Sequence, residues 1–219
     1  MIPFRSIKTL FFDYDGTLHD SIKLYAPSFR KAYAFLVEKG FAEEREWSNK
    51  EISYWLGFNP QAMWENFMPS LSHALREQCS EIIGEEMKQQ IQMDKPILYE
   101  GATETLQYLK DKGYQLVFIS NCKKYYKEYH NKLFGLDNYF EALVCSDDYQ
   151  FIPKHEILAE IKDQYPKESA IIGDRQQDIE AGQKNGIYTI GCTYGFASEG
   201  ELDAADMLIG DIRELKKYL

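Results

Sequence analysis

Short and almost wholly apolar runs alternate with longer amphipathic segments through most of this chain. The runs cover residues 7–12, 114–120, 142–145, 170–172 and 187–191, with a weaker one at residues 207–209. Near-continuous apolarity over so few residues is typical of strands buried on both faces, as in parallel sheets. The amphipathic segments at residues 103–112, 124–134, 154–164 and 176–184 predict helices. The alternation therefore predicts an α/β fold with a doubly wound parallel sheet.

One long segment interrupts this rhythm, because no convincing strand lies between about residue 21 and about residue 93. Its pattern instead predicts helices at residues 28–39, 50–56, 60–68 and 71–92. The segment directly follows the first predicted strand. We therefore expect an α/β core made of residues 1–20 and 94–219, and an inserted all-helical cap made of residues 21–93. Such an insertion either serves as a lid above the strand ends or forms an additional helical layer.

The net charge of the chain limits the classes of partner that we expect it to bind. The 219 residues include 25 basic and 35 acidic side chains, a formal net charge of −10. We therefore expect no nucleic-acid partner bound through overall charge and no anionic membrane surface. No apolar run approaches the ~18 residues of a membrane span. An acidic protein that binds an anionic ligand needs a local source of positive charge, and a bound metal ion is the obvious one.

The cysteines predict a reduced protein. Cys79, Cys122, Cys145 and Cys192 form no C-x-x-C pair, and Cys145 and Cys192 fall in apolar runs where a thiol packs as a small hydrophobe. The first twelve residues contain no apolar stretch long enough for a secretory signal. We therefore expect a cytoplasmic location.

Polar side chains follow four of the predicted strands, at the edge where open α/β sheets bind ligands. They are Asp13 and Asp15 after the first strand, Ser120 and Asn121 after the second, Lys154 opening the helix after the third, and Asp174 and Asp178 after the fourth. Four carboxylates in one crevice would repel each other and raise their pKa values, and a hard divalent cation such as Mg²⁺ relieves that repulsion. The hydroxyl, amide and lysine could then hold a phosphate. An aspartate could act as nucleophile and form an aspartyl phosphate, with a second carboxyl as acid and then base.

These motifs resemble those of the haloacid dehalogenase-like superfamily. The matching features are D-x-D-G-T-L at residues 13–18, Ser-Asn at residues 120–121, a lysine before a helix at residue 154, and G-D-x-x-x-D at residues 173–178. The helical insertion resembles the cap of the phosphoglycolate phosphatase-like group, and residues 181–195 and 205–209 are similar to that group as well. The likeness covers nearly the whole chain and implies a Rossmann-like parallel sheet.

The resemblance implies a role for each matching residue. Asp13 would be the nucleophile that attacks phosphorus. Asp15 would protonate the leaving oxygen and then activate water. Ser120 and Lys154 would bind the phosphoryl group, with Asn121 nearby. The implied enzyme is a phosphatase acting on a small phosphorylated metabolite.

The resemblance also implies a Mg²⁺ site. Its ligands would be the carboxylates of Asp13 and Asp174 and the backbone carbonyl of Asp15. Asp178 would bind the ion directly or support its ligands from behind.

Departures from the family pattern bear on the alternatives. Lys154 is flanked by Pro153 and His155, where the family often has Lys-Pro. Dehalogenases lack the second acid of the first motif, so the presence of Asp15 disfavours that activity. Sugar-phosphate mutases carry a histidine where this chain has Tyr25, and the cap loop at residues 57–60 has no basic residue. A mutase therefore stays an alternative, as does a non-catalytic binding protein.

Other assignments stay open on the sequence alone. Phe58 is a candidate substrate contact because it falls in a predicted cap loop, and the roles of His19 and His155 are undecided. Phosphoglycolate, sugar phosphates, nucleotide monophosphates and pyrophosphate are all possible substrates. We expect a monomer or a homodimer.

Overall fold

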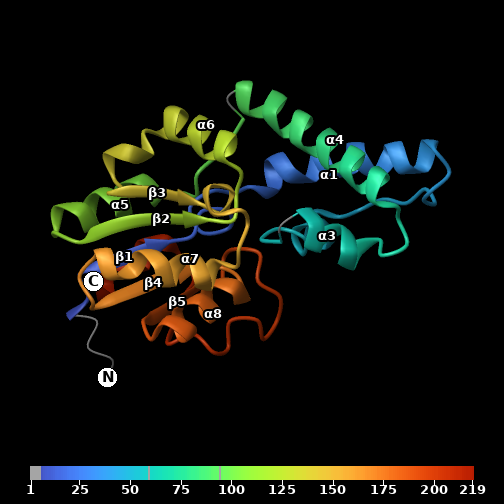
Figure 1. The fold of residues 1–219 in the computed structure, drawn as a ribbon. Helices are drawn as coiled ribbons and strands as arrows, with labels where there is room; N and C mark the ends of the chain where they lie inside the picture. Colours follow the sequence, from blue (N-terminus) through green and yellow to red (C-terminus); the bar gives the residue numbers. More distant parts are fainter. Residues whose placement is uncertain (1–5, 59, 94) are drawn as a thin grey trace. The chain divides into compact units, whose positions relative to one another are not determined.

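The computed structural model describes residues 6–58, 60–93 and 95–219. These residues form two compact units (Figure 1). One joins the described residues before Ser21 to Leu98–Leu219, and the other is Ser21–Ile97. The predicted core boundary at residue 94, and Asn59 of the predicted loop at residues 57–60, lie outside the described residues.

The first unit is built on a six-stranded sheet in which every neighbouring pair is parallel. Its strands are β1 (Thr9–Phe12), β2 (Gln115–Ser120), β3 (Ala142–Cys145), β4 (Ser169–Gly173), β5 (Tyr188–Cys192) and β6 (Met207–Ile209). Their spatial order is β3-β2-β1-β4-β5-β6, so the first strand of the chain lies inside the sheet. The predicted α/β class with a parallel sheet is confirmed.

The register of the strands places their carboxyl ends at one level. Phe12, the last residue of β1, pairs with Phe118 of β2 on one side and with Ile172 of β4 on the other. The residues that immediately follow these three strands therefore emerge at the same edge of the sheet.

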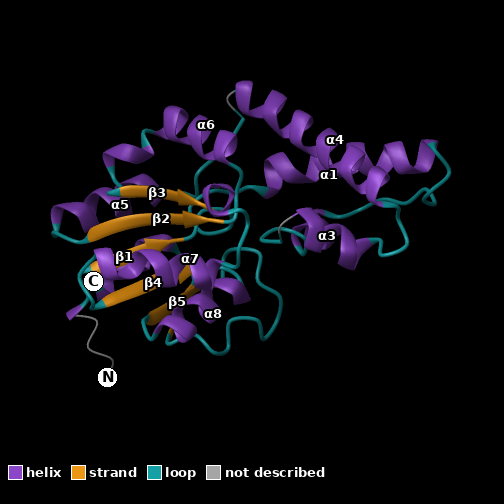
Figure 2. Ribbon diagram, viewed as in Figure 1, coloured by secondary structure: helices purple, strands orange, loops and turns teal. Residues whose placement is uncertain are grey.

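Helices cover both faces of this sheet (Figure 2). They are α5 (Ala102–Asp111), α6 (Lys124–Phe134), α7 (Lys154–Ile161), α8 (Gln176–Asn185) and α9 (Leu215–Tyr218). Short 3₁₀ turns are η2 (Leu136–Asn138), η3 (Ser146–Tyr149), η4 (Lys162–Gln164) and η5 (Ile212–Glu214). On one face, the strand residues Phe11, Val117 and Ile171 pack against Leu158 of α7 and Ala181 of α8.

The opposite face buries the alternate strand residues. The rings of Phe12 and Phe118 both pack against Phe140, at centroid distances of 6.0 and 5.9 Å. The side chains of successive strand residues point to opposite faces, so strands buried on both faces have the continuous apolarity seen in the sequence.

The second unit is all helical, with α1 (Ile22–Glu38), α2 (Asn49–Ser53), α3 (Pro60–Phe67) and α4 (His73–Gln92). Its core joins Leu36 of α1, Trp64 of α3 and Ile83 of α4. The prediction for the first helix was wrong at its start, because α1 begins six residues before Ser28 and contains Pro27. Proline costs a helix one backbone hydrogen bond, and burial of Leu24 and Ala26 in the first turns offsets that loss.

The chain leaves and re-enters the α/β unit through hydrogen-bonded segments. His19 and Leu98 form an antiparallel bridge, and the amide of Tyr99 donates to the carbonyl of Leu18 at 2.8 Å. Hydrogen bonds between residues of the α/β unit therefore hold the two ends of the helical insertion next to each other.

The helices and the cysteines bear on the expectations about membranes and disulfides. Among the helices of the described residues, none is both long enough and apolar enough to cross a bilayer. All four cysteines are free thiols.

Candidate active site

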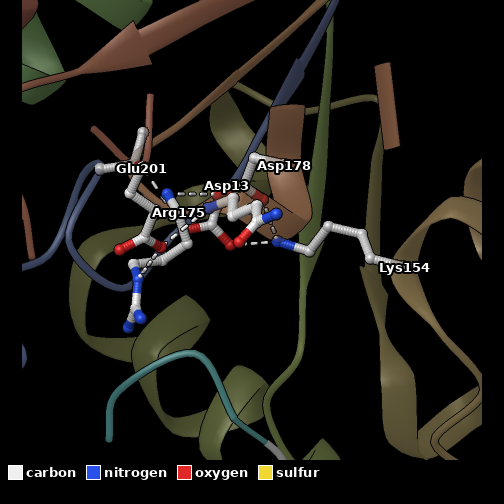
Figure 3. Close-up of polar contacts among 7 residues, drawn as sticks. Asp13, Lys154, Arg175, Asp178 and Glu201 are labelled. Atoms are coloured by element: carbon white, nitrogen blue, oxygen red, sulfur yellow. Dashed lines mark hydrogen bonds and ion pairs between the residues drawn. The ribbon is translucent and has the colours of Figure 1, made fainter. Parts of the chain in front are cut away.

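Asp13 begins the candidate site directly after β1. Its backbone amide donates to the carbonyl of Ile172 at 2.8 Å, which continues the pairing between β1 and β4 by one residue. Its side chain is buried, and Oδ1 accepts a hydrogen bond from Nζ of Lys154 at 2.6 Å. Lys154 is the first residue of α7, so the third predicted motif reaches the first one through space (Figure 3).

Asp178 holds the other side of the same lysine. Its Oδ1 accepts from Nζ of Lys154 at 2.6 Å, and its Oδ2 accepts from the backbone amide of Arg175 at 3.0 Å. The second bond caps the first turn of α8, where a carboxylate also favours the helix dipole. Both oxygens of Asp178 are therefore engaged.

Asp174 follows β4 and completes a cluster of three buried carboxylates. Carboxylate oxygens of Asp13, Asp174 and Asp178 all lie within 4.8 Å of one another. Oδ2 of Asp174 accepts the backbone amide of Phe196 at 2.6 Å. Its Oδ1 is buried and has no hydrogen-bond partner among the described residues.

Two glycines make room for Asp174. Gly16 has a φ of +88°, and a Cβ atom there would overlap the Asp174 carboxylate. A Cβ atom at Gly195 would overlap the Asp174 side chain and crowd the backbone of Gly16. The first motif therefore needs its glycine for the turn and for the close approach of the fourth motif.

The electrostatics of the cluster call for more positive charge than Lys154 supplies. Burial raises the pKa of Asp13 to about 7, with the attraction of Lys154 opposing that rise and the repulsion of Asp178 adding to it. Burial and repulsion from Asp13 and Asp178 raise the pKa of Asp174 well above its ordinary range. Three carboxylates face one ammonium, and each raised pKa reports that a buried negative charge is under-compensated.

The residues fit a divalent cation. All donors are carboxylate oxygens, which hard ions such as Mg²⁺ prefer. The unpartnered Oδ1 of Asp174 gives an ion a buried ligand atom that no protein donor occupies. Asp13, Asp174 and Asp178 are the carboxylates within reach of a shared ion.

The carboxylate of Asp15 makes its hydrogen bonds elsewhere. Oδ1 accepts from the hydroxyl of Tyr126 at 2.8 Å and lies 2.9 Å from Nδ1 of His19. Burial alone would raise the pKa of Asp15, but the hydrogen bonds from His19 and Tyr126 bring it below its ordinary value. Asp15 is thus held by different neighbours from those of Asp13.

The remaining predicted residues lie as follows. Ser120 is the last residue of β2 and is buried at the same edge of the sheet as Asp13, and Asn121 follows it, half-buried. Phe58 belongs to the helical unit, where its ring packs 6.1 Å from that of Trp55. His155 is 3.3 Å from Nζ of Lys184, between α7 and α8.

Sequence reasoning missed a buried ion pair beside the site. Nε of Arg175 donates to Oε1 of Glu201 at 2.7 Å, and Figure 3 shows the arginine side chain directed away from Lys154. Glu201 also accepts from the backbone amide of Ser198 at 2.8 Å. These bonds tie the loop that holds Phe196 to the start of α8. Arg175, which lies within the fourth motif, was the available signal, but its acidic partner lies 26 residues away.

Tyr126 and His130 were also missed. They are four residues apart on α6, and their rings stack with centroids 4.0 Å apart. The Tyr126 hydroxyl donates to Asp15, and the His130 ring packs against His19. The i, i+4 spacing of two polar aromatic residues was a usable signal, but alone it is as typical of a helix packing face.

Residues 10–192 match the family model described as haloacid dehalogenase-like hydrolase. The chain is 25% identical to pyrophosphatase PpaX of Bacillus mycoides over 212 residues, covering 90% of this chain and 89% of that protein. It is 28% identical to a phosphoglycolate phosphatase of Aquifex aeolicus over 199 residues, covering 87% and 86%.

Solved structures share the fold over nearly the whole chain. A predicted phosphatase from Clostridium acetobutylicum superimposes with a TM-score of 0.78 at 25% identity, covering 96% of this chain and 97% of the other. A predicted phosphoglycolate phosphatase from Haemophilus somnus gives 0.80 at 22% identity with the same coverage. The chain belongs to the haloacid dehalogenase-like hydrolase family, which confirms the resemblance found in its motifs.

Proposed function

We propose that this hydrolase is a Mg²⁺-dependent phosphatase that removes the phosphoryl group from a small phosphomonoester through an aspartyl phosphate on Asp13. The observation that carries the proposal is the buried group formed by Asp13, Asp174, Asp178 and Lys154 at one end of the sheet. The family match and the two kinds of phosphatase relative agree with it.

In the first step, a carboxylate oxygen of Asp13 attacks phosphorus and the bond from phosphorus to the leaving oxygen breaks. Asp15 gives its proton to that oxygen, so the product leaves as an alcohol. Lys154 and Ser120 bind the phosphoryl oxygens as charge shifts onto the leaving group. Lys154 is held for this by Asp178, which accepts one of its hydrogen bonds at 2.6 Å.

In the second step, water attacks the phosphorus of the aspartyl phosphate. Asp15, now a carboxylate, takes the proton from that water, and the bond from phosphorus to the Asp13 oxygen breaks. Inorganic phosphate leaves, and Asp13 is restored as a carboxylate.

Asp13, Asp174 and the backbone carbonyl of Asp15 would hold Mg²⁺, with Asp178 behind them. A bound divalent cation supplies charge neutralisation for the phosphoryl oxygens and for the carboxylates themselves. Asp174 is fitted to this role because one of its oxygens already accepts from the Phe196 amide, which orients the other.

The mutase alternative is not favoured by the surroundings of Tyr25. Its ring lies 6.2 Å from that of Phe29 and packs on the core of the helical unit, which supports a structural role at the position where mutases carry histidine. The cap function of residues 21–93, the contact of Phe58 with substrate, the cytoplasmic location and the monomeric or dimeric state stay predictions.

The test is phosphate release from a panel containing phosphoglycolate, glycerol 2-phosphate, glucose 6-phosphate, AMP, pyrophosphate and 4-nitrophenyl phosphate. Each is assayed with Mg²⁺ and with EDTA, for the wild type, Asp13→Asn and Asp163→Asn. The last is a matched control, because Asp163 undergoes the same chemical change on a side chain that is 74% exposed.

We expect release that requires Mg²⁺, persists in Asp163→Asn and falls at least about 1,000-fold in Asp13→Asn, because the nucleophile is removed. Turnover retained by a folded Asp13→Asn variant would overturn the mechanism. Conversion of a sugar phosphate into an isomer, without phosphate release, would favour the mutase.

A further inference from the structure

One carboxylate oxygen of Asp15 is contacted by two side chains, one from the same loop and one from a distant helix. The Tyr126 hydroxyl, 111 residues away on α6, donates to Oδ1 at 2.8 Å, and Nδ1 of His19 lies 2.9 Å from the same atom. His19 and Tyr126 are buried, whereas the Asp15 side chain is 24% exposed. Among the described residues, the hydrogen bonds of this carboxylate end on Oδ1, so Oδ2 is the oxygen left for another partner.

The hydrogen bonding defines which nitrogen of His19 carries a proton. Oδ1 of Asp15 accepts hydrogen bonds both when the carboxyl group is ionised and when Oδ2 carries the proton, so His19 must donate to it through Nδ1. Its Nε2 is buried and has no partner among the described residues. The contact of His19 with Asp15 therefore runs through Nδ1 alone.

Aromatic packing fixes both donors in place. The ring of Tyr14 stacks on His19 with centroids 5.2 Å apart and an interplanar angle of 11°, and His130 meets the edge of His19 at 4.7 Å. His130 in turn stacks on Tyr126 at 4.0 Å. The backbone amide of Gly16 donates to the carbonyl of His19 at 2.9 Å, which closes the loop around Asp15. Neither ring can turn without disrupting this cluster.

We propose that His19 and Tyr126 are positioning residues that hold Oδ1 of Asp15 and thereby present Oδ2 to the leaving oxygen of the substrate. The inference rests on the proposed role of Asp15 as the acid of the first step. Two donors on one oxygen fix the rotation of the carboxyl group and leave Oδ2 to carry the transferred proton. Misplacement of a reacting group by about 1 Å can cost roughly 100-fold in rate. Fixing the position of the Asp15 carboxyl group should therefore increase the rate of turnover.

The leaving group reports on proton transfer. An alkyl alkoxide is a poor leaving group and needs the proton from Asp15, whereas 4-nitrophenolate leaves without one. The measurement is therefore kcat/KM for two substrates: the alkyl monoester that the wild type hydrolyses fastest, and 4-nitrophenyl phosphate. For both, kcat/KM covers steps up to departure of the leaving group and excludes the later attack of water.

Tyr126→Phe removes only the hydroxyl. We expect kcat/KM for the alkyl monoester to fall roughly 10- to 100-fold, as part of the total effect of an acid catalyst, while the value for 4-nitrophenyl phosphate stays within about twofold. A merely structural defect would lower both values together. Equal losses, or no loss on the alkyl substrate, would overturn the proposal.

Tyr14→Phe is the matched control. It also removes a buried hydroxyl from this aromatic cluster, but that hydroxyl lies 2.5 Å from Nδ1 of His130 and is not one of the two groups that hydrogen-bond to Asp15. We expect an unchanged ratio between the two substrates. A selective loss on the alkyl substrate in Tyr14→Phe equal to that in Tyr126→Phe would show that any disturbance of the cluster is sufficient, and would overturn the proposal.

Two substitutions of His19 test the second donor. His19→Asn keeps an N–H group near the position of Nδ1, and His19→Leu keeps bulk without a donor. We expect the substrate ratio of His19→Asn to lie closer to the wild type than that of His19→Leu. Identical ratios in two folded variants would remove His19 from the proposal.

Asp15→Asn separates failure of this inference from failure of the proposed function. If Asp15→Asn loses activity on the alkyl substrate selectively and the Tyr126 and His19 variants do not, only the positioning role is wrong. If Asp15→Asn lowers both substrates equally, Asp15 is not the acid, and the proposed mechanism and this inference fall together.

Discussion

Nζ of Lys154 lies 2.6 Å from Oδ1 of Asp13, and the two side chains are only 3% and 9% exposed. Burial alone would lower the pKa of Lys154, but attraction to Asp13 and Asp178 raises it above its ordinary value. The lysine is therefore charged at every physiological pH and compensates two buried carboxylates. It has a structural role in addition to its proposed contact with phosphate.

Lys154→Met should therefore lower stability as well as activity. Removing one partner of a buried ion pair typically costs about 3–5 kcal/mol, because the other charge is left uncompensated. We expect a decrease of that order in the free energy of unfolding, measured by urea denaturation with EDTA present. Lys162→Met, at a partly exposed lysine 3.8 Å from Asp163, should change it by less than about 1 kcal/mol. Equal effects would contradict this account.

Binding of Mg²⁺ should release protons near neutral pH. Without metal, burial raises the pKa of Asp13 to about 7 and also raises that of Asp174, whereas a cation binds the ionised forms. At pH 7 we expect release of at least roughly half a proton per ion, because a group whose pKa equals the pH is half protonated. Affinity should rise with pH through this range.

Calorimetric titration of Mg²⁺ in two buffers with different ionisation enthalpies measures this release. The apparent binding enthalpy should differ between the buffers at pH 7, and the difference should shrink as the pH rises above 7 and Asp13 becomes ionised before the metal binds. Binding enthalpies that are the same in both buffers at pH 7 would show that Asp13 is already fully ionised.

Gly16→Ala should disable the site. At a φ of +88° the alanine is strained, and its Cβ would displace the Asp174 carboxylate. We expect a stability loss of about 1–3 kcal/mol and at least a 100-fold loss of phosphate release. Gly113→Ala is a close control, because Gly113 has a φ of +87° and nothing within 4 Å of the added Cβ. That variant should lose stability through strain alone and keep full activity.

His130 should make stability depend on pH. Burial, with the neighbouring His19, lowers the pKa of His130 to about 3, although Asp15 opposes the shift. Between pH 6.5 and pH 3 the unfolded chain binds a proton at this residue that the folded protein does not. The stabilisation is therefore complete above pH 6.5 and is lost as the pH falls through that window, by up to about 1.4 kcal/mol per pH unit.

The measurement compares the free energies of unfolding of the wild type and His130→Gln across this range. The advantage of the wild type should shrink as the pH falls. His73→Gln is the matched control, because it makes the same chemical change on a side chain that is 85% exposed. A flat difference for His130→Gln would mean that the imidazole is protonated in the folded state.

The sequence predicted the sheet well because burial on both faces leaves a local mark. The run at residues 142–145 coincides with β3, and the helix predicted at residues 124–134 coincides with α6. The start of α1 was not predictable in this way, because Pro27 normally breaks the pattern and only packing of Leu24 and Ala26 outweighs it.

The candidate site was predictable to the extent that parallel strands end at one edge. That rule alone places Asp13, Ser120 and Asp174 together. The direction in which each side chain points was not predictable. Asp15 is two residues from Asp13, yet its partner Tyr126 is supplied by a helix 111 residues later, and no local pattern encodes that meeting.

The pinned ends of the helical insertion make it a module. Because Leu18 and Tyr99 are hydrogen-bonded to each other within the α/β unit, the segment between them is a closed loop whose two ends lie side by side. The entropic cost of closing such a loop grows slowly, by only about 0.6 kcal/mol of free energy for each doubling of its length. Residues 21–97 can therefore change in length or sequence at small entropic cost, while the group formed by Asp13, Asp174 and Lys154 in the α/β unit keeps its geometry.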